Sequence, residues 1–549
     1  MVAVAQIIGG AGCGKTTELL RIMELVIDQG VDPMEIGFVS FTRAARAEAA
    51  SRAAAKFGIG QNTLEQGGWF RTLHSICYRQ LKLTQDEVLS DRKADREWLK
   101  TALQVDTDAA VEGESDNLLS ACFEQRSEVD IVLGLWSCAR NRLVPFVDVW
   151  ELAKHCEDRT PDFDWCVDII KRYELAKAMQ SRLDFTDMLG RFTGWRFGVE
   201  GHERGDCRGD VPYVPVWFLD EAQDNSALTD AVARRLVEHS RYAYIVGDPY
   251  QAIFGWSGAD PRHFMSWGVA DQNRHILPRT FRYGRSVLDL GESILREQCS
   301  DYFDRGIAPA EHDTEIETCL FDGDWLSQIV PGESWLLIAR TNFHASRIAR
   351  RLEEHDIPWT PLRGMGGVNA PVRNSGLRAL YYLQCDVEPT HEEWRNAVGL
   401  LPAKLGGEDL LVRGAKTRWK KAQDDDVREE PIGPLHDAGA TPRLIDLIRS
   451  GKWVDLIEGA ERWREMCAHW ETTDLGEIPI RVGTIHSAKG AEADNVLVLQ
   501  TSTAQIAKGM ETEAGRNEEG RVAYVAVTRA KRRLIVAKER CLHRIDLGV

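Results

Sequence analysis

The sequence has no hydrophobic run long enough to span a bilayer and no signal-like start. A membrane-spanning helix needs about 20 consecutive apolar residues, and none of the apolar runs in the 549 residues approaches that length. Residues 1–8 carry no basic flank ahead of their apolar stretch, which argues against a secretory signal. We therefore expect no membrane partner.

Paired cysteines and a surplus of positive charge are also missing. The twelve cysteines are scattered singly, with no Cys-x-x-Cys pair and no histidine cluster at zinc-ligand spacing. This pattern indicates neither a disulfide framework nor a structural metal, and it points to a reducing compartment, the cytoplasm. The net charge of −17 excludes a protein that coats nucleic acid with its whole surface, although it leaves room for a local groove.

What is present is the ordinary balance of a globular protein, with 43% hydrophobic and 28% charged residues. The length predicts about three or four domain-sized units. Strand and helix patterns alternate at the start: residues 3–8 predict a strand, 15–28 an amphipathic helix and 36–41 a second strand. Further strands are predicted at residues 216–219, 242–246, 335–338, 481–485, 496–499 and 534–537.

Two stretches interrupt this alternation. Residues 81–180 and residues 375–473 are polar, charged and helical in pattern, without an obvious strand. The alternation of strands and helices on either side is typical of parallel sheets. We predict an α/β protein with two halves, each a parallel sheet flanked by helices and each carrying a mainly helical insertion.

A phosphate-binding loop follows the first strand. The segment Gly9-Gly-Ala-Gly-Cys-Gly-Lys-Thr16 fits G-x-x-x-x-G-K-[ST] and lies between a strand and a helix, as that motif requires. Backbone N–H groups of such a loop surround phosphate, Lys15 neutralises the β and γ oxygens, and the Thr16 hydroxyl ligates Mg²⁺. We predict an ATP and Mg²⁺ site in which the nucleotide contacts Gly9, Gly10, Ala11, Gly12, Cys13, Gly14, Lys15, Thr16 and Thr17.

An acidic pair follows a later apolar strand. Asp220 and Glu221 come directly after Trp217-Phe-Leu219. One carboxylate can hold Mg²⁺ while its neighbour polarises the attacking water. On the pattern alone, either carboxylate could take either role.

Nine blocks in order resemble the UvrD/Rep/PcrA branch of superfamily 1 DNA helicases. Each block is a weak pattern alone, but their order and spacing are hard to obtain otherwise. The blocks are Gly9 to Thr16, Val39-Ser-Phe-Thr-Arg-Ala-Ala45, Thr72-Leu-His-Ser75, Leu183-Asp-Phe-Thr-Asp-Met-Leu189, Asp220-Glu-Ala-Gln-Asp224, Val246 to Ala259, Thr280-Phe-Arg282 and, near the end, Thr484 to Glu492 with Tyr524 to Ala530.

The resemblance implies two RecA-like P-loop motor domains. The first would comprise residues 1–80 and 181–275 with the insertion 81–180, and the second residues 276–374 and 474–549 with a reduced insertion at 375–473. It implies that Asp220 holds the metal with Thr16 and that Glu221 acts in catalysis. It further implies that Gln251 senses the γ-phosphate and that Arg282 and Arg529 reach it from the second domain, so that closure and hydrolysis are coupled.

The resemblance also implies the remaining contacts. Phe281 would stack on adenine, unless it is a core aromatic, and Glu492 would bind the ribose hydroxyl. Aromatic side chains would stack on bases regardless of sequence, with polar ones holding phosphates beside them, and a core role for one of the aromatics remains an alternative. The predicted DNA-binding residues are Phe41, Thr42, Arg43, His74, Phe254, Trp256 and His486.

One departure concerns the base. The family carries a helix with an adenine-reading glutamine ahead of the phosphate loop, whereas here only eight residues precede Gly9 and they form the strand. Gln6 cannot serve from that position. We expect base selectivity to be relaxed or supplied by another segment.

The leading hypothesis is an ATP-dependent DNA helicase that translocates 3′ to 5′ on single-stranded DNA and separates duplex. Its partners would be single-stranded DNA, single-strand/duplex junctions and replication or repair proteins, and it would act as a monomer or weak oligomer in a bacterial or phage-infected cytoplasm. The polarity rests on family analogy. A translocase that strips proteins from DNA, a nucleotide-gated signalling module and an RNA motor remain alternatives.

Overall fold

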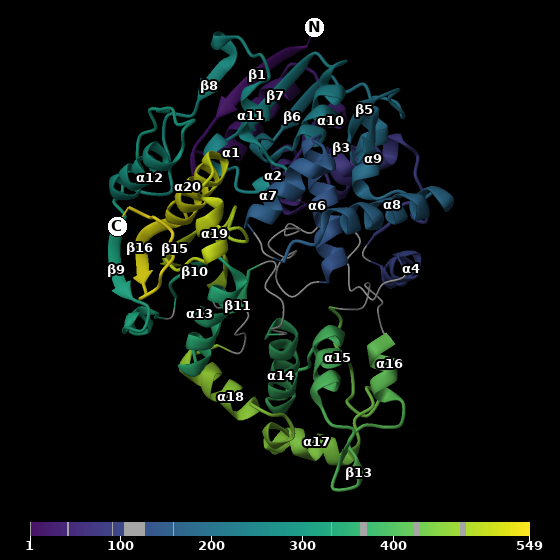
Figure 1. Cartoon of the computed structure of the whole chain (residues 1–549). Coiled ribbons are helices and arrows are strands. Elements are labelled where there is room, and N and C mark those ends of the chain that lie inside the picture. The colour runs from purple at the N-terminus through teal and green to yellow at the C-terminus, as the bar shows by residue number, and fades with distance from the viewer. Residues whose placement is uncertain are drawn as a thin grey trace. The chain divides into compact units, whose positions relative to one another are not determined.

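The computed structural model describes residues 2–40, 43–90, 92–103, 127–156, 159–330, 332–362, 370–421, 429–472 and 479–548. The chain forms two compact units (Figure 1). The first contains Met1–Thr318, Ile485–Glu492 and Gln500–Val549, and the second contains Cys319–Thr484 and Ala493–Leu499. Among the helices in the described ranges, none is both long and apolar enough to cross a membrane.

A six-stranded parallel sheet forms the centre of the first unit. Its inner strands Ile36–Val39 and Val216–Leu219 are buried throughout, which explains why they read in the sequence as continuous apolar runs rather than as alternating ones. The order across the sheet is β3 (Trp69–Arg71), β2 (Ile36–Val39), β6 (Val216–Leu219), β7 (Tyr242–Gly247), β1 (Ala3–Ile8) and β8 (Arg274–Ile276).

Helices cover both faces of this sheet. One core joins strand side chains such as Phe38 and Phe218 to α1 (Lys15–Asp28) and α2 (Arg43–Phe57). The other joins Trp217 and Ile245 to a second helical layer. That layer consists of α3 (Leu73–Gln80), α9 (Phe185–Thr193), α10 (Ala227–Val237) and the short α11 (Pro261–Met265).

The first predicted insertion is helical where it is described. Its helices share a core of their own around Trp136 and Phe146. They are α4 (Lys93–Leu103), α6 (Glu128–Arg142), α7 (Phe146–Cys156) and α8 (Phe163–Met179), and the hairpin β4 (Trp195–Gly198) and β5 (Gly201–Arg204) follows α9.

A second six-stranded sheet has the order β11-β14-β10-β15-β16-β9. The pairs β11–β14, β14–β10 and β10–β15 are parallel. The strands are β11 (Thr360–Pro361), β14 (Ile480–Thr484), β10 (Trp335–Ala339), β15 (Ala493–Leu499), β16 (Ala530–Lys538) and β9 (Glu315–Leu320). The predicted α/β class, with two parallel sheets flanked by helices, is confirmed.

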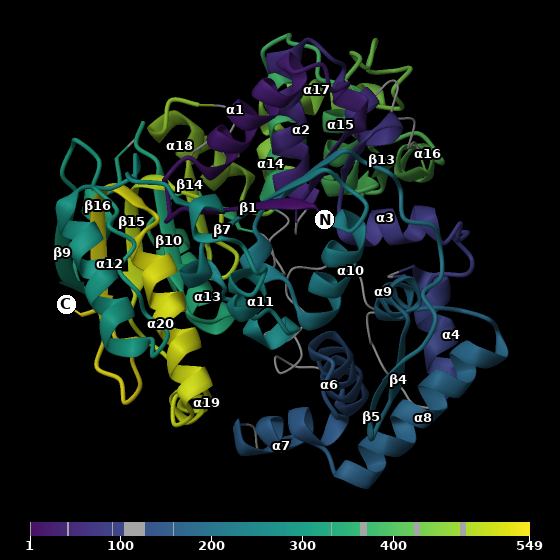
Figure 2. The ribbon, with the colours of Figure 1, turned by 90° about the horizontal axis from the view of Figure 1, so that it is seen from above.

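Two helices of the first unit that are distant in sequence pack against each other. Figure 2 shows α12 (Arg285–Gln298) lying along α20 (Glu513–Val527), and the two pack closely. The short α19 (Ala504–Gly509) precedes α20. Although α12 and α20 are more than 200 residues apart in sequence, their packing brings two of the predicted motifs into the same unit. These motifs are Thr280–Arg282, just before α12, and Tyr524–Ala530, which overlaps the end of α20.

The second unit contains the other predicted insertion. Besides α13 (Asn342–Glu354), it has a group of helices and one small hairpin. These are α14 (Ala370–Gln384), α15 (His391–Leu400), α16 (Ala415–Lys421), α17 (Pro442–Arg449) and α18 (Ala460–His469), with β12 (Lys404–Leu405) and β13 (Glu408–Asp409). The four-part domain division with its boundaries stays a prediction.

Candidate nucleotide and DNA site

The carboxyl ends of the first sheet's strands bring the predicted motifs together. Ile8 pairs with Gly247, and the Gly9 N–H donates to the Gly247 carbonyl at 3.0 Å, so the phosphate loop lies beside the segment after β7. The Asp220 N–H donates to the Val39 carbonyl at 2.8 Å. Ligands of open α/β sheets bind at this edge.

The phosphate loop has the backbone that its glycines permit. Gly12 and Gly14 have φ values of 72° and 77°, and Gly14 caps α1. The Lys15 ammonium donates to the Gly9 carbonyl at 3.1 Å, which holds it across the loop. Thr16 lies beside it in the first turn of α1, and the exposed Thr17 accepts a hydrogen bond from Arg52 at 2.9 Å.

The Thr280–Arg282 segment packs directly on this loop. The Phe281 N–H donates to the Gly12 carbonyl at 2.9 Å, and the Thr280 hydroxyl donates to the Ala11 carbonyl at 2.8 Å. A Cβ at Gly12 would lie 2.4 Å from the Cβ of Arg282, so only glycine allows this approach. The Phe281 ring is 69% exposed and lies close to Gly14, which is the placement of a ring available for stacking rather than of a core aromatic.

The two acidic residues differ in backbone and in partners. Glu221 adopts the left-handed backbone conformation, with a φ of 54°. Its carboxylate accepts a short hydrogen bond from the Gln223 amide. Burial works to raise the pKa of Glu221, but Lys15 and Lys489 outweigh it, so the pKa lies below its ordinary value and the carboxylate is ionised.

Gln223 ties the acidic pair to the segment after β7. Its amide oxygen accepts the Asp248 N–H at 3.1 Å, and a Cβ at Gly247 would lie 2.3 Å from that oxygen. The Gln251 amide in turn donates to the Asp248 carboxylate at 2.8 Å. The predicted phosphate sensor is therefore held by the same segment that, through Gln223, holds the predicted catalytic carboxylate.

The predicted γ-phosphate arginines lie in the same unit. The Arg282 guanidinium donates to Glu492, the predicted ribose ligand, at 2.7 Å, and to the Thr528 carbonyl at 3.2 Å. Arg529 is buried and donates to the Val525 carbonyl at 3.0 Å. Burial, with Arg282 adding to it, lowers the pKa of Arg529 to about 9, so the guanidinium is still protonated at neutral pH.

Lys489 joins the segment around Glu492 to the acidic motif. Its ammonium donates to Asp224 at 2.6 Å and to the Gln251 carbonyl at 2.6 Å, and it lies 4.8 Å from the centre of the Phe254 ring. Burial, reinforced by Glu221, raises the pKa of Asp224 to about 7, although Lys489 opposes the rise.

The predicted DNA-binding residues fall into three groups. Phe254 and His486 are 6% and 5% exposed and lie against each other, with ring centres 6.3 Å apart. Trp256 is partly exposed and meets Phe254 edge-on at 5.9 Å. His74 lies at the start of α3, where it meets Phe185 edge-on at 6.0 Å.

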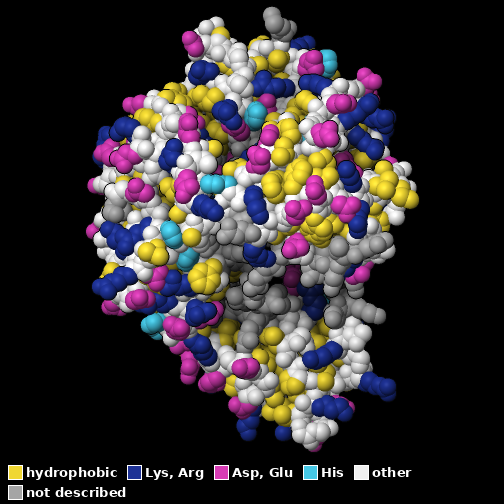
Figure 3. Space-filling model, viewed as in Figure 1, with side chains coloured by type: hydrophobic (Ala, Val, Ile, Leu, Met, Phe, Trp, Pro, Cys, Tyr) yellow, Lys and Arg dark blue, Asp and Glu magenta, His cyan; other side chains and the backbone are white. Residues whose placement is uncertain are grey.

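The third group is at the start of α2. Phe41 and Thr42 lie outside the described residues, and of Arg43 only the backbone is described. Of the two aromatic side chains in this loop, Trp256 is the more exposed, and Phe254 packs against it. Basic and acidic side chains are interspersed over the face drawn in Figure 3, so a strand would need a local groove.

Packing accounts for the surroundings of two residues, Gln6 in the first strand and Cys13 in the phosphate loop. Gln6 is fully buried, and its amide donates to the Phe264 carbonyl at 2.7 Å, in agreement with the expectation that it cannot read a base. Burial raises the pKa of the Cys13 thiol to about 11, which keeps it protonated and unreactive. All cysteines in the described ranges are free, as expected.

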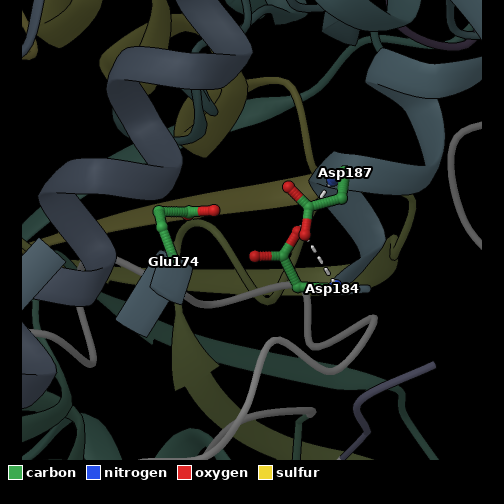
Figure 4. A group of neighbouring side chains, drawn as sticks. All are labelled: Glu174, Asp184 and Asp187. Carbon is green, nitrogen blue, oxygen red and sulfur yellow. Dashed lines mark hydrogen bonds between the residues drawn. The ribbon is translucent and has the colours of Figure 1, made fainter. Parts of the chain in front are cut away.

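A carboxylate cluster elsewhere in the first unit has the spacing of a metal site. Glu174, Asp184 and Asp187 point toward one another (Figure 4). However, Lys177 donates to all three at 3.0, 2.7 and 2.6 Å, and Arg140 donates to both aspartates at 2.8 and 3.1 Å. Two buried cations already occupy the space that a metal ion would need.

The sequence alone assigned no role to three residues that lie beside the site. Lys489 and Tyr524 lie inside the recognised blocks, but their partners are distant in sequence. Arg305 lies in a loop without any pattern, yet its guanidinium is buried against Asp248 at 2.8 Å. No local signal marks such a residue, because its role depends on contacts formed only in the fold.

The chain is similar to known helicase families over most of its length. The model of the UvrD/REP helicase N-terminal domain matches residues 3–268, and that of the UvrD-like helicase C-terminal domain matches residues 470–540. YjcD of Bacillus subtilis is 22% identical over 97% of this chain and 76% of its own length.

The ATP-dependent DNA helicases PcrA of Bacillus subtilis and of Leuconostoc citreum are 26% and 24% identical, each over 53% of this chain. The aligned parts cover 37% and 36% of those two relatives, so the chain spans little more than a third of either PcrA. The two family models cover the phosphate loop and the acidic pair on one side and residues 484–492 and 524–530 on the other, while Thr280–Arg282 lies between the two matches.

Proposed function

The chain belongs to the family of UvrD-like ATP-dependent DNA helicases, and from that premise we propose that it moves 3′ to 5′ along single-stranded DNA and unwinds duplex ahead of it. The observation that carries the proposal is one cluster in the first unit. In it the phosphate loop, the acidic pair and Gln251 lie beside Arg282 and Arg529, and Lys489 connects them to the predicted strand contacts. Single-strand/duplex junctions would be the natural substrates.

The residues of the cluster suit hydrolysis of a γ-phosphate. Glu221 is ionised and oriented by Gln223, so it can orient and deprotonate the attacking water. Lys15, Arg282 and Arg529 supply the positive charge that stabilises the phosphoryl oxygens as their charge develops. The lysine acts from the phosphate loop and the arginines from the segments that pack on it.

Mg²⁺ fits the oxygen donors at this edge. The Thr16 hydroxyl and the Asp220 carboxylate are the hard ligands that Mg²⁺ prefers, and they would hold it beside the β- and γ-phosphates. The ion would supply charge neutralisation of the phosphate oxygens there.

Adenosine would lie against the exposed ring of Phe281. The ring lies near Gly14 and Thr17, at the mouth of the loop, and Glu492 is available for the ribose. Because Gln6 is turned inward to Phe264, base reading falls to Phe281 and its surroundings.

Lys489 provides a physical link between the two predicted sites. It contacts Asp224 and Gln251 on the nucleotide side and lies over Phe254, which supports Trp256, on the strand side. A change in the position of Gln251 on hydrolysis would therefore shift Lys489 and, through it, the positions of Phe254 and Trp256. This supports a motor in which nucleotide state and strand grip are coupled.

The test combines ATP hydrolysis with unwinding. We expect single-stranded DNA to stimulate hydrolysis, and we expect a 3′-tailed duplex to be opened in preference to a 5′-tailed one. Opening of the 5′-tailed duplex alone would refute the polarity. DNA-stimulated hydrolysis without unwinding, together with removal of a DNA-bound protein, would favour a protein-displacing translocase, and hydrolysis indifferent to DNA would favour a signalling module.

A further inference from the structure

Arg305 is a fully buried cation in the loop that follows α12. Its Nη1 donates to Asp248 at 2.8 Å and its Nη2 donates to Glu292 at 2.6 Å. The faces of Tyr250 and Tyr524 cover it, with ring centres 4.7 and 5.2 Å from the guanidinium carbon. Burial of this charge is unfavourable without such partners, so the two carboxylates and the two ring faces hold the guanidinium in place.

Asp248 connects Arg305 to the predicted phosphate sensor. One carboxylate oxygen, Oδ1, accepts from Arg305, and the other, Oδ2, accepts from the Gln251 amide at 2.8 Å. Arg305 thereby fixes the rotation of the Asp248 carboxylate. The orientation of the carboxylate in turn fixes the side chain of Gln251.

Tyr524 connects Arg305 to the phosphate loop. Its hydroxyl accepts the Ala11 N–H at 3.3 Å and lies 3.4 Å from both Arg305 Nη1 and Asp248 Oδ2. Ala11 is one of the loop residues whose N–H groups serve phosphate oxygens in such loops. A phosphate oxygen and the Tyr524 hydroxyl therefore compete for the same donor.

We propose that Arg305 is a positioning residue, and that with Asp248 and Tyr524 it forms a hydrogen-bond relay between the phosphate loop at Ala11 and the γ-phosphate sensor Gln251. The proposal rests on the proposed function in taking Gln251 as that sensor. When a phosphate oxygen accepts the Ala11 N–H, the Tyr524 hydroxyl loses that donor and keeps Arg305 as the other, so its own bond to Asp248 changes. Occupation of the loop thus sets the geometry of Gln251.

The decisive variant is Tyr524→Phe, which removes the hydroxyl and keeps the ring over Arg305. We would measure the affinities of ADP and of the non-hydrolysable ATP analogue AMP-PNP, with Mg²⁺ and without DNA. ADP affinity should be unchanged or rise by up to about fivefold, because a competitor for Ala11 is removed, while the preference for AMP-PNP over ADP should fall by about fivefold. In DNA-stimulated hydrolysis, kcat should fall by about tenfold without a rise in KM.

Tyr250→Phe is the matched control. Its hydroxyl bonds to the backbone of Asp301 and Phe303, its ring also covers Arg305, and it does not contact Ala11. This variant should keep the wild-type preference for AMP-PNP within about twofold. Arg305→Lys keeps the charge but lacks the fork that reaches Asp248 and Glu292 together, so it should lose the preference as well.

Two results would overturn the relay. One is a parallel fall of ADP and AMP-PNP affinities in Tyr524→Phe, which would make the tyrosine merely structural. The other is a variant that matches the wild type in both affinities and kcat. The ratio of the AMP-PNP and ADP affinities requires no turnover, so it tests the relay even if the wild-type protein fails to hydrolyse ATP with DNA. Such a failure would refute the proposed function and not the relay.

Discussion

The Arg282 guanidinium donates through both Nε and Nη2 to one carboxylate oxygen of Glu492, at 2.7 Å each. The other oxygen of Glu492 pairs with Lys531 at 2.7 Å. Burial works to raise the pKa of Glu492, but Arg282 and Lys531 outweigh it, so the pKa lies below its ordinary value. An arginine predicted for the γ-phosphate is therefore held by a carboxylate predicted for the ribose, and it must leave that carboxylate to reach phosphate.

Glu492→Gln should separate these two roles. Loss of the ribose contact should raise KM for ATP by about fivefold, because one charge-assisted hydrogen bond is lost, while release of Arg282 should keep kcat from falling. Steady-state hydrolysis of ATP, 2′-deoxy-ATP and 3′-deoxy-ATP checks this, since the variant should discriminate less among them. Glu311→Gln, which loses only the exposed pair with Arg279, is the control and should leave KM unchanged.

Lys15→Ala should abolish hydrolysis and spare strand binding. The lysine acts on phosphate oxygens, so its removal should lower kcat by a factor of at least about 10² to 10³. The affinity for a fluorescent oligonucleotide should stay within about threefold, because the predicted strand contacts lie elsewhere. Loss of both activities together would contradict a two-site picture.

Trp256→Ala should show the reverse pattern. Loss of one stacking side chain costs about 1 to 3 kcal/mol, so the affinity for single-stranded DNA should fall by about five- to 150-fold. Hydrolysis in the absence of DNA should be unchanged. A fluorescence-anisotropy titration measures the loss, and equal affinities of variant and wild type would remove Trp256 from the strand interface.

Asp224 should make stability depend on pH. Burial raises its pKa to about 7 from 3.8, so the folded chain holds this proton more tightly than the unfolded chain. The stabilising effect is complete below about pH 4 and is lost as the pH rises to about 7. The difference between the denaturation midpoints of the wild type and Asp224→Asn should therefore change between pH 5 and 7, and a constant difference would contradict the assignment.

The carboxylate cluster of Figure 4 should depend on its cations rather than on a metal. Lys177→Met leaves Asp184 and Asp187 with one buried cation, so it should lower the free energy of unfolding by about 3 to 5 kcal/mol. Thermal unfolding of the wild type should be insensitive to EDTA and to added Mn²⁺. Stabilisation of the wild type by Mn²⁺ would contradict the ion-pair interpretation.

Local patterns predicted most of the sheet and the loop chemistry. The strands 3–8 and 216–219 and the helix 15–28 have the predicted bounds, because buried parallel strands read as short apolar runs and α1 repeats its apolar residues at helical spacing. Short edge strands such as β3 and β8 escaped prediction, since three residues carry too little pattern. The phosphate loop could be recognised from the sequence because its glycines, Lys15 and Thr16 lie in one short contiguous segment.

The sequence by itself therefore determined the α/β class, the phosphate loop and the family resemblance, because these rest on local patterns and on the order of those patterns along the chain. Only the tertiary structure decided which distant residues complete the site. Arg282 meets Glu492 across 210 positions, Lys489 meets Asp224 across 265, and Arg305 lies against Asp248 in a loop without a motif. Such pairs are set by strand order and helix packing, and their charges are held together because burial makes an unpaired partner unfavourable.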